Sequence, residues 1–186
     1  MADNFVVGDI FDQLDKILSN TNFEGVTEES SGFEDLPDGY YLCEVEKAEI
    51  KASKSSGQPM AAFQFSIVEN GVDVDQNENG AISMKELSKT KGRKIFKYYV
   101  LKDESSVKRF ASDMLKFEGD TEGEPLLPKE AFSSSETVED ALDVLTGMRI
   151  YTQQSTSVRT VDGKDVESKW VNLISWKRAR ALELPM

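Results

Sequence analysis

The segment at residues 93–101 combines positive charge with aromatic side chains at the spacing of a β-strand. One alternation carries Arg93, Lys97 and Tyr99, and the other carries Lys94, Phe96 and Tyr98. Aromatic rings stack on unpaired bases, at about 1–3 kcal/mol per base, and lysine and arginine pair with phosphates. The segment therefore predicts contacts to a single-stranded nucleic acid through Arg93, Lys94, Lys97 and Tyr99. The sequence does not decide which alternation is exposed.

The same pairing of a basic and an aromatic residue recurs later in the chain, at Arg149 with Tyr151 and at Lys169 with Trp170. Lys51 and Lys54 flank a predicted hairpin loop and add positive charge. Any single aromatic residue in a short strand is more often part of a core than of a binding site. The combination across three strands favours nucleic-acid binding, and all six residues join the candidate contacts.

A second candidate site is the twelve-residue segment Asp75–Glu86, which follows the pattern of a calcium-binding loop. Gly80 stands where that loop turns sharply. The predicted calcium ligands are the side chains or carbonyl oxygens of Asp75, Asn77, Asn79, Ala81, Ser83 and Glu86. The preceding residues predict a strand where an EF-hand needs a helix, so a polar loop without calcium is the favoured interpretation and calcium binding is the alternative.

Other chemistry is excluded by composition. The chain contains no histidine and a single cysteine, Cys43, which rules out histidine-based catalysis and an internal disulfide. It contains no glycine-rich phosphate-binding motif. We therefore predict a protein that is not an enzyme, requires no cofactor and resides in a reducing cytoplasm. No apolar run approaches the roughly 18 residues that a bilayer span needs.

The elements that must position these residues are mainly strands. Residues 40–50 alternate with a change of parity near Lys47, which predicts a β-bulge. The further predicted strands are residues 61–67, 93–101, 148–159 and 167–176, and the predicted helices are residues 107–117 and 137–145. Three strands, a helical insertion and two strands predict a mainly β, OB-like five-stranded barrel. Its predicted domain spans residues 39–177, with an acidic insertion at 103–146.

Both ends of the chain differ from this domain. Residues 3–19 have the apolar spacing of an amphipathic helix, and residues up to 38 read as a flexible linker. Residues 178–186 read as a short basic tail. The helix either packs on the barrel or binds a partner, and self-association through it stays open.

Charge is distributed unevenly along the chain, whose net charge is −12. Residues 1–38 hold ten acidic residues and one basic residue, and residues 103–146 hold twelve acidic and four basic residues. The strand-forming segments hold twelve acidic and 17 basic residues. A single-strand binder needs positive potential along a groove rather than over the whole protein, so the distribution is compatible with DNA binding.

Several short motifs resemble a known family. They are Leu36–Tyr40 opening a strand, Gly57–Met60 before a second, Gly92–Phe96 opening a third and Leu145–Arg149 before the final hairpin. Together they resemble small bacteriophage OB-fold single-stranded DNA-binding proteins of replication and recombination modules. The resemblance covers residues 36–177. It implies DNA binding without sequence preference, phage replication or recombination proteins as partners, and the host cytoplasm as location.

Two other functions stay open at this point. The acidic surface and the N-terminal helix could make the chain a protein-interaction module that binds a host or phage protein. The calcium-like segment could instead belong to a calcium-stabilised structural protein. Binding of single-stranded DNA is the function that the residues favour most.

Overall fold

The computed structural model describes residues 15, 19 and 35–186, which divide into two units at Asp35 and Leu36. In the first unit, Asp15 and Ser19 are helical and exposed. The rest of the predicted helix at 3–19, and most of the predicted linker, lie outside the described residues. Everything that follows concerns the second unit, Leu36–Met186.

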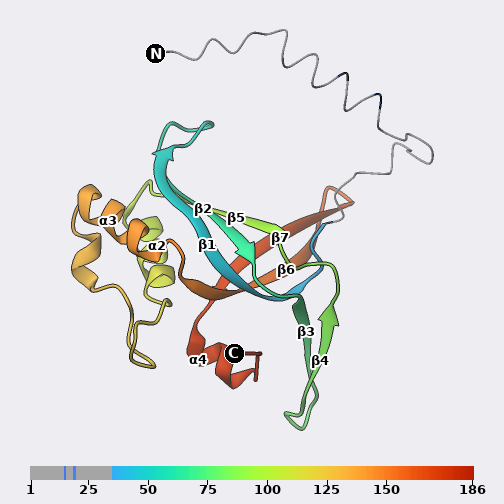
Figure 1. The fold of residues 1–186 in the computed structure, drawn as a ribbon. Helices are drawn as coiled ribbons and strands as arrows, with labels where there is room; N and C mark the ends of the chain where they lie inside the picture. The colour runs from blue at the N-terminus through green and yellow to red at the C-terminus, as the bar shows by residue number, and fades with distance from the viewer. Residues whose placement is uncertain (1–14, 16–18, 20–34) are drawn as a thin grey trace. The chain divides into compact units, whose positions relative to one another are not determined.

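The second unit is mainly β, as predicted, with an antiparallel sheet of seven strands (Figure 1). The strands are β1 (Gly39–Ala52), β2 (Pro59–Ile67), β3 (Gly71–Gln76), β4 (Ile82–Leu87), β5 (Lys94–Val100), β6 (Arg149–Val161) and β7 (Lys164–Ile174). The helices are α2 (Glu104–Met114), the short 3-10 helix η1 (Lys129–Phe132), α3 (Ser135–Leu145) and α4 (Trp176–Ala181).

Strand β1 is the centre of the sheet. It pairs with β6 through Gly39–Glu44 and with β2 through Cys43–Ala52, while Tyr40 pairs with Val72 of β3. Beyond these neighbours, β5 pairs only with β2, and β7 pairs only with β6, in the described part of the chain. The sheet is therefore open between β5 and β7, and the described residues form an open sheet of seven strands where the sequence predicts an OB-like barrel of five.

The two extra strands and their turn include the segment Asp75–Glu86, which we predicted to be a polar or calcium-binding loop. They form the β3–β4 hairpin, in which Val72 and Val74 pack against a small core next to the C-terminus. Figure 1 shows this hairpin projecting from the sheet on the side away from α2 and α3. The predicted bulge in β1 is confirmed, because the β1–β2 register shifts between Val45 and Lys47.

Both faces of β1 are covered before its bulge. Tyr41 and Cys43 of β1 face the main core, to which α2 contributes Phe110 and α3 contributes Leu142. The alternate residues of β1 face a second core that α4 and the following residues complete. Leu184 is buried in this second core, so residues 178–186 are a folded part of the unit rather than a tail.

The predicted helices are confirmed with shifted ends. Helix α2 begins one turn earlier than predicted, because Asp103 is its N-cap and accepts a hydrogen bond from the Ser106 backbone N–H. Helix α3 ends before Gly147, which has a positive φ of 87°. None of the described helices is long and apolar enough to cross a membrane.

Candidate nucleic-acid interface

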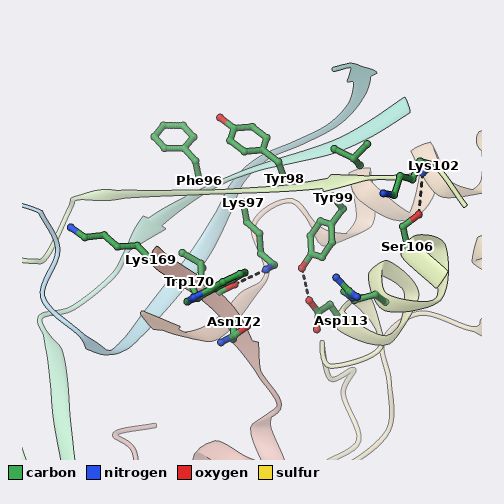
Figure 2. A pocket seen from close by; sticks show the side chains of 13 residues that line it. Phe96, Lys97, Tyr98, Tyr99, Lys102, Ser106, Asp113, Lys169, Trp170 and Asn172 are labelled. Atoms are coloured by element: carbon green, nitrogen blue, oxygen red, sulfur yellow. Dashed lines mark hydrogen bonds between the residues drawn. The ribbon is translucent and has the colours of Figure 1, made fainter. Parts of the chain in front are cut away.

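The opening between β5 and β7 forms a groove, which we call the β5–β7 groove. Its volume is about 700 Å³, and helix α2 closes one end (Figure 2). The residues that line it are Phe96, Lys97, Tyr98, Tyr99, Val100, Lys102, Ser106, Arg109, Asp113, Lys169, Trp170, Val171 and Asn172.

Backbone groups of both edge strands face this groove. The Leu101 N–H donates to the Pro59 carbonyl at 2.8 Å, and the Ile67 N–H donates to the Arg93 carbonyl at 2.9 Å. Odd-numbered residues of β5 therefore direct their peptide groups to β2, and even-numbered residues such as Phe96 direct theirs to the groove.

Two lysines fill the space that a paired strand would take. Lys97 of β5 donates from Nζ to the Val171 carbonyl at 2.5 Å, and Lys116 donates to the Leu173 carbonyl at 2.8 Å. The two carbonyls lie on the free edge of β7, where they have no strand partner in the described structure. Side chains thus satisfy the edge and hold β5 and β7 apart, which keeps the groove open.

The floor of the groove is a buried polar network. Tyr99 donates from its hydroxyl to Asp113 Oδ2 at 2.7 Å, and Lys116 donates to Asp113 Oδ1 at 2.6 Å. The Lys97 ammonium lies 4.9 Å from the centre of the Tyr99 ring. Burial lowers the pKa of Lys97 and raises the pKa of Tyr99, whose hydroxyl also meets the Asp113 charge. These partners fix the floor in one arrangement.

The rim of the groove carries three exposed aromatic rings. Phe96, Tyr98 and Trp170 are 51%, 54% and 54% exposed. Figure 2 shows Phe96 and Tyr98 on the opposite side of β5 from Lys97 and Tyr99. Trp170 donates from Nε1 to the Ser157 hydroxyl at 2.9 Å, which orients its indole. Large apolar rings that are exposed to water often belong to contact surfaces. Here two such rings lie on the outer face of β5, and Trp170 lies on the groove side.

Positive charge surrounds the rings. Lys97, Lys102, Arg109 and Lys169 line the groove, and Asp113 is the one acidic residue among its lining residues. Ser106, Arg109 and Asp113 reach the groove together because they are spaced three and four residues apart on α2. The groove is therefore positive although the whole chain is strongly acidic.

A comparison with protein families finds a match for this chain. A family described as "Protein of unknown function (DUF669)" matches residues 23–118, just over half of the chain. The chain belongs to the DUF669 family. This is a phage-type family. A comparison with curated proteins finds no match.

The matched residues of this DUF669 protein include β5 and α2 but not β7. Phe96, Tyr98, Lys102 and Arg109 thus belong to the family region, whereas Trp170 lies beyond it. One wall of the groove is built from the family region, and the other comes from the rest of the chain.

The groove brings together only some of the residues that the sequence singled out. Lys97, Lys169 and Trp170 line it, and Lys51 lies beside it, with its ammonium 5.9 Å from the centre of the Tyr98 ring. Lys94 is on the outer face of β5, where it pairs with Glu46 at 2.7 Å.

The other predicted contacts lie elsewhere. Arg93 precedes β5, and Lys54 is exposed in the β1–β2 loop. Arg149 pairs with Glu44 at 3.5 Å and lines a different hollow, next to Trp176. The structure does not join these three to the β5–β7 groove.

Two predicted stacking residues are core residues instead. Tyr99 is 7% exposed and Tyr151 is 3% exposed, so neither ring can receive a base. Tyr151 packs against Trp176 and donates its hydroxyl to the Pro185 carbonyl. The prediction for both tyrosines is corrected: each stabilises the fold through its ring and hydroxyl.

Sequence reasoning missed Phe96, Tyr98, Lys102 and Arg109 as contacts. Phe96 and Tyr98 were visible as the other alternation of the same strand. Arg109 could have been found from its helical spacing with Ser106 and Asp113, and Lys102 from its position just after β5. The position of β7 opposite β5 could not be predicted from the sequence.

The calcium-like segment is a hairpin rather than a loop around an ion. Asp75 pairs with Ser83 across the hairpin, whereas Glu86 pairs with Val72. At about 3.3 Å per residue, the Glu86 position is about 10 Å along the strand from that of Ser83. Asn77 Oδ1 already accepts the backbone N–H groups of Asn79 and Ala81.

The hairpin therefore places Glu86 apart from the other predicted ligands, and the turn that carries these is closed by its own hydrogen bonds. Those other ligands are Asp75, Asn77, Asn79, Ala81 and Ser83. Within residues 15, 19 and 35–186, no three acidic or cysteine side chains are grouped so that they could hold a metal ion.

Proposed function

We propose that this protein binds single-stranded DNA in the β5–β7 groove, without sequence preference and without catalysing a reaction. The observation that supports the proposal most is a groove that holds Trp170 and four basic side chains against one carboxylate, with two further exposed rings, Phe96 and Tyr98, on the outer face of the strand that forms its wall. Rings that stack on bases and cations that pair with phosphates are the two components of such sites. Phage DNA replication or recombination is the process in which we place it.

The strand arrangement supports an OB-like interpretation of the fold. Strands β1, β2, β5, β6 and β7 follow the order of a five-stranded Greek-key barrel in which β5 and β7 would be neighbours. In this chain the barrel is left open at that seam, and the β3–β4 hairpin is an addition. The groove then takes the place of the last pair of strands.

Single strands fit the groove better than duplex DNA. The faces of bases in a duplex are already stacked on one another, so Phe96, Tyr98 and Trp170 could not reach them. The acidic residues of α3 and of the segment before it would also repel a wide, highly charged duplex. We therefore expect binding to oligo-dT and little binding to a duplex of equal length.

Tryptophan fluorescence tests the proposal directly. The Trp176→Phe variant leaves Trp170 as the only tryptophan, and it is titrated with oligo-dT of about 30 nucleotides at low and moderate salt. We expect saturable quenching whose logarithmic affinity falls with the logarithm of salt by about 0.7 per phosphate contact. A flat titration at low salt would reject the proposal and favour a protein-interaction module.

Charge variants separate groove binding from general attraction. Lys169→Ala and Arg109→Ala remove cations from the groove, whereas Lys85→Ala removes an exposed cation from β4. We expect the two groove variants to weaken oligo-dT binding and to reduce the salt dependence. Equal effects of all three variants would mean that binding is not located in the groove.

A further inference from the structure

A second, smaller hollow adjoins the β5–β7 groove on the outer face of the sheet. Its volume is about 170 Å³, and we call it the outer hollow. It is lined by Lys47, Glu49 and Lys51 from β1, by Ala62, Phe63 and Gln64 from β2, and by Phe96 and Tyr98 from β5.

Phe96 and Tyr98 are common to both hollows. They line the β5–β7 groove and the outer hollow alike, so they form a ridge between the two. Both rings are about half exposed, and in Figure 2 both project outward from β5. A chain of nucleotides that stacks on this ridge can therefore reach either hollow.

The bulge in β1 places charged side chains in the outer hollow. Before the bulge, odd-numbered residues such as Cys43 and Val45 are buried. Because the bulge inserts one residue, the odd-numbered residues after it, Lys47, Glu49 and Lys51, lie on the outer face. Without the bulge this charged row would point into the core.

A single carboxylate, that of Glu49, forms ion pairs with both lysines of the outer hollow. Lys47 Nζ lies 2.8 Å from Glu49 Oε2, and Lys51 Nζ lies 3.4 Å from Glu49 Oε1. Hydrogen bonds, the strongest from Lys47, lower the pKa of Glu49, so this side chain is ionised at neutral pH. A phosphate would accept from the same ammonium groups, and Glu49 competes with it.

We propose that the outer hollow is a second subsite for single-stranded DNA, which the strand enters from the β5–β7 groove by crossing the ridge of Phe96 and Tyr98. Lys51 lies 5.9 Å from the centre of the Tyr98 ring, so it can bind the phosphate next to a base stacked on that ring. This inference rests on the proposed function and adds to it the path of the strand and a carboxylate that limits affinity.

The affinities for short and long DNA oligomers distinguish binding at the second subsite from binding in the groove alone. Oligo-dT of about 4 nucleotides can fill the groove alone, whereas about 16 nucleotides can reach both hollows. We expect Lys51→Ala to weaken binding of the long oligomer by about two- to fivefold and to leave the short oligomer unaffected. Fluorescence anisotropy of labelled oligomers at two salt concentrations measures both affinities.

Removal of the competing carboxylate should change the affinity for DNA in the opposite direction. We expect Glu49→Gln to strengthen binding of the long oligomer by about two- to fivefold, because it releases both lysines. Glu44→Gln is the matched control: it removes the same charge from the same strand, but Glu44 pairs with Arg149, outside the outer hollow. The control should change affinity less than Glu49→Gln does.

The outcomes separate the two proposals. If oligo-dT binds but Glu49→Gln and Glu44→Gln act alike, or if Lys51→Ala weakens both oligomers equally, the second subsite is overturned and the groove remains. If no oligomer binds at either salt concentration, the proposed function fails, and the second subsite fails with it.

Discussion

At the scale of single residues, Tyr98 and Tyr99 show that two neighbours in one strand can have different roles, one on the surface and one in the core. The two side chains leave β5 on opposite faces, one 54% and the other 7% exposed. Tyr98 can stack on a base, whereas Tyr99 packs edge-on against Phe63 and Phe110 and donates to Asp113. The sequence identified the aromatic strand, but both alternations contain lysine and aromatic residues.

The alternation could be assigned only from distant contacts. Lys97 is half-buried because its ammonium reaches a carbonyl 74 residues later, at Val171. Nothing near Lys97 in the sequence signals that partner. For the same reason Trp170 could be predicted as a contact, whereas its position opposite Phe96 and Tyr98 could not.

Substitution of the two neighbours tests the assignment. We expect Tyr98→Ala to weaken oligo-dT binding by at least about fivefold, through loss of one stacking ring, with little change in stability. Tyr99→Phe keeps the buried ring but removes a hydrogen bond to a carboxylate. It should lower the free energy of unfolding by about 1.5–3 kcal/mol and leave binding nearly unchanged.

Urea unfolding and fluorescence titration of both variants provide the two measurements. The assignment of β5 would be wrong if Tyr99→Phe weakened binding while Tyr98→Ala did not. Because Tyr98 is about half exposed and is not a core residue, loss of stability in Tyr98→Ala would also contradict it.

At the scale of elements, the β3–β4 hairpin is the clearest departure from the sequence prediction. Its residues are polar and rich in asparagine and glycine, which favours a loop, and of its few apolar side chains Val72 and Val74 pack against the second core. Long-range packing makes it a hairpin, because these valines cover the core beside α4. By contrast, the bulge, strands β6 and β7 and both insertion helices have strong local signals and were predicted.

The hairpin begins with a close approach of Gly71 to Tyr41. A Cβ at position 71 would lie 2.3 Å from Tyr41 Cε1 and 2.4 Å from Tyr41 Cδ1. Tyr41 cannot move easily, since it is fully buried and donates to the Pro37 carbonyl. We therefore expect Gly71→Ala to lower the free energy of unfolding by about 1–3 kcal/mol.

Gly119→Ala is the control for the general cost of replacing glycine. A Cβ there would lie no closer than 3.6 Å to any other group, at Leu126 Cα. Chemical denaturation compares the two variants. If they are equally stable, the close packing of β3 on Tyr41 contributes nothing measurable, and the hairpin is held by its valines alone.

At the scale of the whole molecule, charge is separated between surfaces. The division of acidic and basic residues along the sequence predicted a positive binding surface in a chain of net charge −12. The structure locates positive charge in the β5–β7 groove and acidic residues in the helical insertion. The sequence could not show that the C-terminal residues fold back, because only three buried apolar side chains, Ala179, Leu182 and Leu184, mark that segment.

The C-terminal segment is tied to the helical insertion by a bidentate ion pair. Arg180 of α4 donates to both oxygens of Glu118, at 2.8 and 3.1 Å, and lies 3.2 Å from Glu122. Hydrogen bonding to Arg180 lowers the pKa of Glu118 below its ordinary value of 4.5. The pair therefore stabilises the folded state above pH 4.5, and this contribution is lost as the pH falls through the lowered pKa.

We expect Glu118→Gln to lower the Tm by about 2–4 °C at neutral pH, with a difference from the unsubstituted protein that disappears in acid. Glu122→Gln, which removes a more exposed carboxylate with a single contact, should have a smaller effect. Thermal unfolding from pH 7 down to about pH 3 measures both. A difference for Glu118→Gln that stays constant with pH would mean that this side chain acts through packing. The C-terminal segment would then be held by its apolar contacts and not by the charge of the insertion.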